Sequence, residues 1–189
     1  MKITQQLIDG LVTIIKIGPK LNRDQREEIR TIVGELGDEL QRALKMAIAY
    51  LEKAPRINED QAYSDYLSNS TSKLLSAFNE FEICSGIYGL HDRFNQAFDP
   101  TRYSINLGSI QKVHDLIDSL GDGERMVIDG MDKLTEDLRE MAWEFDAASD
   151  DDKEVIRRQI NTFIKLSIGS IESDRKNIKR TVREVLKVM

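Results

Sequence analysis

Apolar residues recur every three or four positions along most of the chain, a spacing typical of one buried face of an α-helix. The longest such run consists of Ile110, Val113, Ile117, Leu120, Glu124, Val127, Met131, Leu134, Leu138, Met141 and Phe145. Steps of three and four alternate through this run, and ten of its eleven positions are apolar. It therefore predicts a helix that is packed along its whole length. No segment alternates between apolar and polar residues next to turn signals, so no β-sheet is expected.

Prolines and one capping signal divide the chain into five helical segments. Pro19, Pro55 and Pro100 fall where the periodicity breaks, and proline lacks a backbone N–H and disfavours helical geometry in the residue before it. A fourth break lies at Ser149, which is expected to cap a helix with three aspartates in its first turn. The expected segments are a short leading helix over 1–18 and long helices over 22–54, 59–98, 104–147 and 150–189.

Two of the other long segments also carry one apolar face. In 22–54 this face consists of Ile29, Val33, Leu36, Leu40, Ala43, Ala47 and Leu51. In 150–189 it consists of Ile164, Ile168, Ile171, Arg175, Ile178, Val182, Val185 and Met189. Helices of about 33 to 44 residues extend about 50 to 65 Å, and neighbours joined by short loops pack antiparallel. We therefore expect a single all-α domain, an elongated antiparallel four-helix bundle preceded by a short amphipathic helix.

Glu124 and Arg175 are the two polar residues that interrupt these apolar faces. Glu124 lies 25 residues before Ser149 and Arg175 lies 26 residues after it, so a reversal of the chain there would bring them to one level. We predict a partly buried ion pair that fixes the register of the two helices; the alternative is two side chains that snorkel outward. Residues 121–123, Gly-Asp-Gly, could form a turn, but the unchanged heptad phase favours a continuous or slightly kinked helix.

Few residues in the chain are suited to catalysis or metal binding. The only histidines are His91 and His114, and Tyr88 and Gln111 stand where a Glu-x-x-His di-metal motif would need glutamate. Cys84 lies seven helical residues from His91, about 10 Å away, whereas a nucleophile and its base need about 3 Å. Glycine-rich phosphate-binding motifs and calcium-loop spacing are absent. We therefore expect no catalytic residues, no metal and no cofactor.

Charge is unevenly distributed within the net charge of −6. Residues 132–154 contain ten acidic and three basic residues, whereas residues 175–189 contain six basic residues and one acidic residue. Four cations share one helix face, which we call the basic stripe: Lys176, Arg180, Arg183 and Lys187. It could hold an anionic membrane surface or an acidic partner, or it could offset the helix dipole and keep the outer face solvated. No aromatic residues lie between these cations, so nucleic acid is not expected as a partner.

The leading segment is more apolar than its length requires. Its candidate membrane or partner face consists of Ile3, Leu7, Leu11, Ile14 and Ile15. Residues 3–17 would extend about 22 Å, which is too short to span a bilayer of about 30 Å. The segment could cover the end of the bundle, dock onto another chain or lie in a membrane interface.

The sequence as a whole is typical of a cytoplasmic protein that acts by binding other protein chains. It has no run of 18 apolar residues and no signal-peptide pattern, and its single cysteine cannot form an internal disulfide. We expect a non-enzymatic adaptor, oligomerisation or regulatory module that binds a protein partner or itself. One alternative is a membrane-surface or membrane-perturbing effector that uses the leading helix and the basic stripe. Another is an enzyme with an unrecognised site between the helices.

Overall fold

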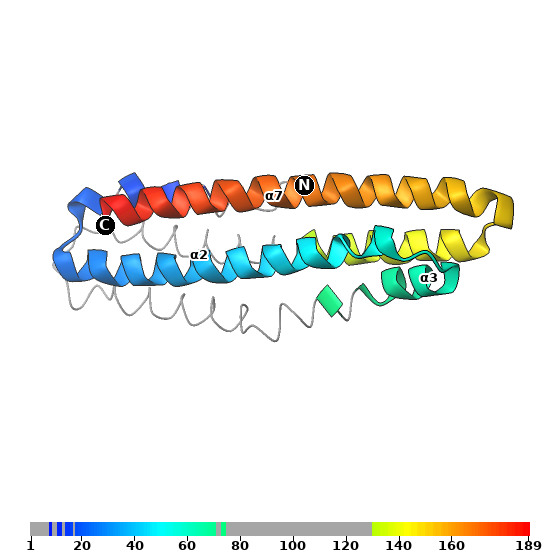
Figure 1. Cartoon of the computed structure of the whole chain (residues 1–189). Coiled ribbons are helices and arrows are strands. Elements are labelled where there is room, and N and C mark those ends of the chain that lie inside the picture. The colour runs from blue at the N-terminus through cyan, green and yellow to red at the C-terminus, as the bar shows by residue number, and fades with distance from the viewer. Residues whose placement is uncertain (1–7, 9–10, 13, 17, 71–72, 75–129) are drawn as a thin grey trace.

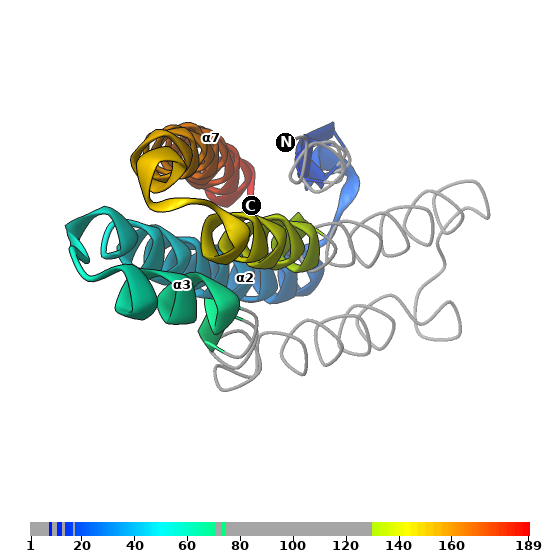
Figure 2. The same cartoon turned by 90° about the vertical axis from the view of Figure 1, so that its right-hand side faces the viewer.

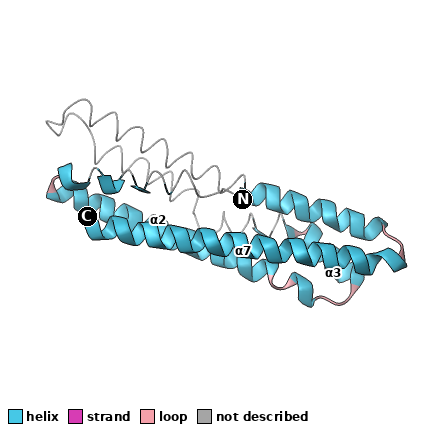
Figure 3. Ribbon diagram, turned by 90° about the horizontal axis from the view of Figure 1, so that it is seen from above, coloured by secondary structure: helices cyan, strands magenta, loops and turns pink. Residues whose placement is uncertain are grey.

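The chain is all-helical over the residues that the structure, a computed structural model, describes. These are residues 8, 11–12, 14–16, 18–70, 73–74 and 130–189. They include the 3₁₀ turns η1 (Gly18–Lys20) and η2 (Ala54–Arg56) and the α-helices α2 (Arg23–Leu51), α3 (Asp60–Ser68) and α7 (Asp150–Val188). Residues 130–147 are also α-helical and lead into α7 through a short loop (Figure 3). No strand occurs among the described residues, which confirms the all-α prediction for this part of the chain.

Helices α2 and α7 lie side by side and run in opposite directions (Figure 1). Gly37 of α2 lies against Val182 of α7. One turn further along α2, Nε2 of Gln41 donates a hydrogen bond to the backbone oxygen of Arg175 at 2.8 Å. Gly18 of η1 lies against Val188, the last residue of α7, and against Met189, which follows it. Later positions on α2 thus meet earlier positions on α7, as helices of opposite direction require.

A continuous hydrophobic core is built from α2, η2, α3, the 130–147 helix and α7, together with Leu11, Ile14 and Leu74. All seven residues of the predicted face of 22–54 are buried. Helix α7 contributes Ile160, Ile164, Ile171, Ile178, Val182 and Val185, and the 130–147 helix contributes Met131, Leu134, Leu138, Ala142 and Phe145. The apolar faces predicted from periodicity are therefore the faces that leave water, because their burial is the main favourable term in folding.

The segment after Pro55 differs from the continuous helix expected over 59–98. Helix α3 ends at Ser68, and Asn69 forms a turn before helical geometry returns at Ser70. The backbone N–H of Asn69 donates to the backbone oxygen of Asp65 at 3.0 Å, and its side-chain Nδ2 donates to the same oxygen at 2.7 Å. Asparagine ends helices in this way because its amide competes for nearby backbone groups. Most of the remaining predicted segment lies outside the described residues.

The predicted break at Ser149 is confirmed, but its hydrogen bond differs from a standard N-cap. Ser149 has extended backbone geometry immediately before α7. Its hydroxyl donates to Oδ2 of Asp152 at 2.6 Å instead of accepting a bond from a backbone N–H. The charged carboxylate is the stronger partner for the hydroxyl, and it also lies at the positive end of the helix dipole.

Candidate interaction surfaces

The outer face of α7 exposes two large apolar side chains. Val155 is 52 % exposed and Leu166 is 70 % exposed. Seen end on, α7 lies at the edge of the assembly of helices (Figure 2). Single exposed apolar residues are common on soluble proteins. Whether these two belong to a contact surface therefore depends on the residues around them.

A line of uncharged residues connects these two side chains along α7. Steps of four and three alternate through Val155, Gln159, Thr162, Leu166, Gly169 and Ser173, which we call the uncharged line. All six are exposed. The line lies on the opposite side of the helix from the buried Ile160, Ile164 and Ile171. Outward faces of surface helices normally carry charged residues, so a long line of exposed positions without charge favours a contact with another molecule.

The basic stripe continues the uncharged line toward the end of α7. The same alternating steps lead from Ser173 to Lys176, Arg180, Arg183 and Lys187, and all four cations are exposed. At the other end of the helix, Asp150, Asp151, Asp152 and Glu154 are exposed as well. Glu154 and Lys176 are 22 residues apart on α7, so about 33 Å of helix separates these two charged regions. The uncharged line thus lies between acidic residues at the start of α7 and the basic stripe at its end, and the exposed charges Arg158, Lys165 and Glu172 lie beside it.

Gly169 in the uncharged line packs against no other segment in the described part of the chain. A Cβ added at Gly169 would meet no atom within 4 Å, whereas a Cβ added at Gly37 would lie 2.9 Å from Cγ1 of Val182. Glycine inside a helix costs about 1 kcal/mol of stability relative to alanine. The close approach of α2 and α7 explains Gly37, but nothing within the described part of the chain explains Gly169.

A cluster around Arg157 holds the acidic end of the molecule together. Nη1 of Arg157 donates to the backbone oxygen of Ile57 and Nη2 donates to Oδ1 of Asp60, both at 2.6 Å. The guanidinium lies 4.1 Å from the centre of the Tyr63 ring and 5.1 Å from that of Phe145. Arg157 of α7 thus contacts the segment before α3, the start of α3 itself and the 130–147 helix. Sequence periodicity did not identify this residue, because it occupies a polar position on α7.

Tyr63 is the buried aromatic member of this cluster. Its hydroxyl donates to Oδ1 of Asn161 at 2.9 Å. Burial raises the pKa of Tyr63 to about 12, although the charge of Arg157 opposes the increase. The next residue, Ser64, is also buried and donates to Oδ2 of Asp146 at 2.6 Å. These bonds join α3 to α7 and to the 130–147 helix, and they suit a structural role.

A pair of tyrosines joins α2 to α3. The rings of Tyr50 and Tyr66 stack with their centroids 4.5 Å apart. The Tyr50 hydroxyl donates to the backbone oxygen of Tyr66 at 2.5 Å, and the Tyr66 hydroxyl donates to that of Tyr50 at 3.0 Å. Burial raises the pKa of both hydroxyls. The pair therefore fixes the position of α3 against the end of α2.

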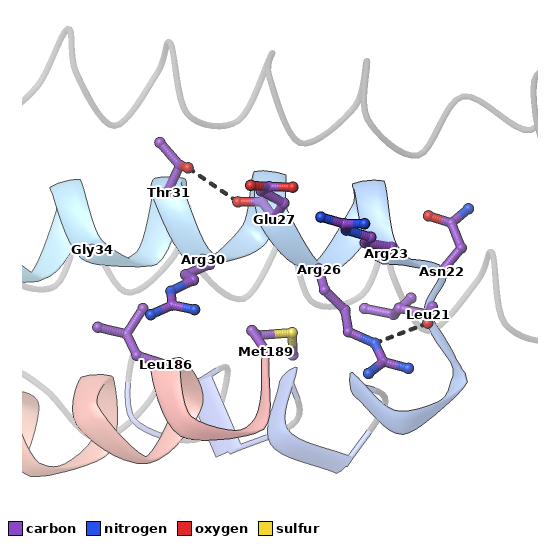
Figure 4. Close-up of a pocket in the computed structure, with 10 residues that line it drawn as sticks. All are labelled: Leu21, Asn22, Arg23, Arg26, Glu27, Arg30, Thr31, Gly34, Leu186 and Met189. Carbon is purple, nitrogen blue, oxygen red and sulfur yellow. Dashed lines mark hydrogen bonds between the residues drawn. The ribbon is translucent and has the colours of Figure 1, made fainter.

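A depression of about 850 Å³ lies at the opposite end, between the start of α2 and the end of α7 (Figure 4). It is lined by Leu21, Asn22, Arg23, Arg26, Glu27, Arg30, Thr31, Gly34, Leu186 and Met189. Nε of Arg26 donates to the backbone oxygen of Leu21 at 3.0 Å, while Arg23 and Arg30 are exposed. Three guanidinium groups and one carboxylate in its lining give this end further positive charge, which attracts anionic groups.

Part of the candidate face of the leading segment lies in the core. Leu11 and Ile14 are fully buried, and Ile15 packs partly against the core. Ile3 and Leu7 lie outside the described residues. The positions of Leu11 and Ile14 are those expected of a segment that covers the hydrophobic core.

Several predicted residues lie where the structure gives no test. Glu124 is outside the described residues, so its pairing with Arg175 stays a prediction; Arg175 itself is half-buried on α7. Residues 121–123 and the side chains of Cys84, His91 and His114 also lie outside the described part. Within the described ranges, no group of three or more His, Cys, Asp or Glu residues is placed to hold a metal ion.

No protein-family model matches the chain, and no curated protein or solved structure is significantly similar to it. Among the helices of the described residues, none is both long and apolar enough to cross a membrane.

Proposed function

We propose that this protein is a non-enzymatic helical module that acts by binding other protein chains, with the outer face of α7 as its contact surface. The observation that carries the proposal is the uncharged line, in which six exposed positions lack charge and Leu166 is 70 % exposed. We also propose that the four long segments form an elongated antiparallel four-helix bundle. The opposite directions of α2 and α7 support this arrangement (Figure 1).

A site-specific photo-crosslinker tests the contact surface directly. It is introduced in place of Leu166, and the full-length protein is irradiated in its native cells. The expected result is a discrete covalent adduct with a protein, since Leu166 would lie inside the contact. The matched control places the same crosslinker at Lys45, an exposed position on α2, where no such adduct is expected. Failure to form an adduct from Leu166 would contradict the proposal.

The basic stripe favours a second candidate, binding to an anionic membrane surface. Its four cations are exposed, but Leu11 and Ile14 would have to leave the core before the leading segment could insert. Flotation of the full chain with anionic and neutral vesicles, at low and moderate salt, tests this candidate. Binding to anionic vesicles that is lost in the double variant Arg180→Glu, Arg183→Glu would support it, and absence of binding at every salt concentration would exclude it.

A further inference from the structure

We infer that a second copy of this chain binds to the outer face of α7, with the two α7 helices packed antiparallel. This inference rests on the proposed contact surface and names its occupant. The order of charge along α7 supports it, because the exposed face begins with acidic residues and ends with the basic stripe. An antiparallel copy places the acidic start of each helix beside the basic end of the other, whereas a parallel copy would place like charges together.

The spacing of the uncharged line allows an antiparallel partner to fit along the whole face. Its alternating steps of three and four read the same in both directions and continue through the basic stripe, so a reversed copy can follow the same spacing. When Leu166 faces the partner's Gly169, Thr162 faces the partner's Ser173. Leu166 then meets the smallest residue of the line near the two-fold axis. Further from the axis, the same register places Val155 opposite the partner's Arg180 and Asp152 beside the partner's Arg183.

The charges beside this line agree with the same register. Lys165 lies at the level of the partner's Glu172, and the two-fold axis repeats the pair; both residues are exposed. Arg158 and the partner's Lys179 are like charges at comparable levels, but Glu154 already pairs with Arg158 within α7. The charge pattern therefore favours this register near the axis and at both ends of the contact.

Gly169 supplies an independent argument for a close neighbour. A Cβ added there would lie within 4 Å of no described residue, and glycine is unfavourable in the middle of a helix. In the antiparallel register Gly169 faces the partner's Leu166, so its missing side chain makes room for the partner's largest apolar group on this face. Two-fold interfaces of this kind bury the same surface on both copies.

The first experiment is sedimentation equilibrium of the full-length protein over a range of concentrations at low and moderate salt. We expect a concentration-dependent shift from 21.6 kDa toward twice that mass. The shift should weaken as salt increases, because the charges at both ends of the contact are exposed. A protein that stays monomeric at the highest concentration in low salt would overturn the inference.

Charge-reversal variants test the antiparallel register. Lys165→Glu and Glu172→Lys each create two repulsive pairs by symmetry, and each should weaken dimerisation about tenfold. An equimolar mixture of the two variants should recover dimers of wild-type strength, because each copy then meets its complement. A parallel dimer would be unaffected by either single variant, so unchanged dimerisation in both would overturn the inference.

Glycine variants separate the contact from ordinary helix stability. Gly169→Ala should raise the melting temperature of the monomer yet weaken dimerisation. Gly34→Ala is the matched control, because a Cβ there also meets no atom within 4 Å; it should raise the melting temperature and leave dimerisation unchanged. Equal dimerisation of the two variants would contradict close contact at Gly169.

Photo-crosslinking from Leu166 distinguishes failure of this inference from failure of the proposed function. An adduct of twice the chain mass supports self-association. An adduct with a different protein, in a chain that stays monomeric, would overturn self-association and leave the proposed contact surface intact. Absence of any adduct would contradict both.

Discussion

At the residue scale, Arg157 shows how one polar side chain can organise several elements. Its guanidinium donates hydrogen bonds to the backbone oxygen of Ile57 and to the carboxylate of Asp60, and it lies over the ring of Tyr63. The Asp60 side chain is half exposed, so water weakens that ion pair. The bond to the Ile57 oxygen and the contacts with the rings therefore contribute most of the stabilisation.

Replacing Arg157 should destabilise the protein measurably. Arg157→Met keeps much of the aliphatic stem but leaves the Ile57 oxygen without its donor, and we expect the free energy of unfolding to fall by about 1 to 3 kcal/mol. The measurement is urea unfolding followed by circular dichroism. Arg158→Met is the control, because Arg158 is exposed and pairs only with Glu154 among the contacts described here. Equal stability of the two variants would show that the Arg157 cluster contributes little.

The raised pKa of Tyr63 predicts a loss of stability at alkaline pH. Because its folded pKa is about 12 and the ordinary value is 10.0, the unfolded state loses the proton first. The contribution of Tyr63 is therefore complete below about pH 10 and is lost as the pH rises from 10 to 12. Tyr50 and Tyr66 act in the same direction.

The test compares urea unfolding of the wild type and Tyr63→Phe between pH 8 and pH 12. Lysines also titrate in this range, so the difference between the two proteins isolates Tyr63. That difference should be constant up to pH 10 and then shrink. A constant difference up to pH 12 would show that the hydroxyl has an ordinary pKa in the folded protein.

At the element scale, α2 contains two glycines with opposite roles. Gly37 lies under Val182 of α7, whose branched side chain leaves no room for a Cβ, whereas Gly34 has open space beside it. Alanine favours helices more than glycine does at both positions. Packing therefore decides the sign of each substitution.

Gly34→Ala should raise the free energy of unfolding by about 0.5 to 1 kcal/mol. Gly37→Ala should lower it by about 1 kcal/mol or more, because overpacking against Val182 exceeds the gain in helix propensity. Both values come from urea unfolding of the full chain. A stabilising Gly37→Ala would mean that α2 and α7 can move apart at little cost.

At the scale of the whole molecule, the leading segment shares its core with helices distant in sequence. Leu11 and Ile14 belong to the same cluster as buried residues of α2 and α7. Leu11→Ala should therefore lower the free energy of global unfolding by about 2 to 5 kcal/mol in a single transition. Val12, which is half-buried, provides the control, and Val12→Ala should cost less. If neither substitution affected global unfolding, the leading segment would have to be independent of the core.

The two ends of the molecule also differ in charge. The 130–147 helix and α7 are joined by a short loop (Figure 1), which is followed by the exposed aspartates at the start of α7. The basic end of α7 lies beside the start of α2, where three arginines line the depression (Figure 4). Sequence segments that are each only moderately charged thus combine into two poles. Such poles orient an approaching charged molecule before contact.

The sequence by itself determined the helical class, the apolar faces of α2 and α7, the break at Ser149 and the exposed basic stripe. These features depend on local spacing, capping and dipole effects, which act within a few residues. Pro19 and Pro55 accordingly lie in the 3₁₀ turns η1 and η2. The uncharged line was also readable in the sequence, as a continuation of the spacing of the basic stripe toward Val155.

Only the tertiary structure decided which residues contact distant parts of the chain and which glycines lie in close helix–helix contacts. Arg157 occupies an ordinary polar position on α7, and its contacts with Ile57 and Asp60 depend on residues about 100 positions away. Likewise, Gly37 and Gly169 are indistinguishable in a helical sequence, yet one lies under Val182 and the other faces open space. Contacts between distant segments arise from packing of whole elements, which local spacing does not specify.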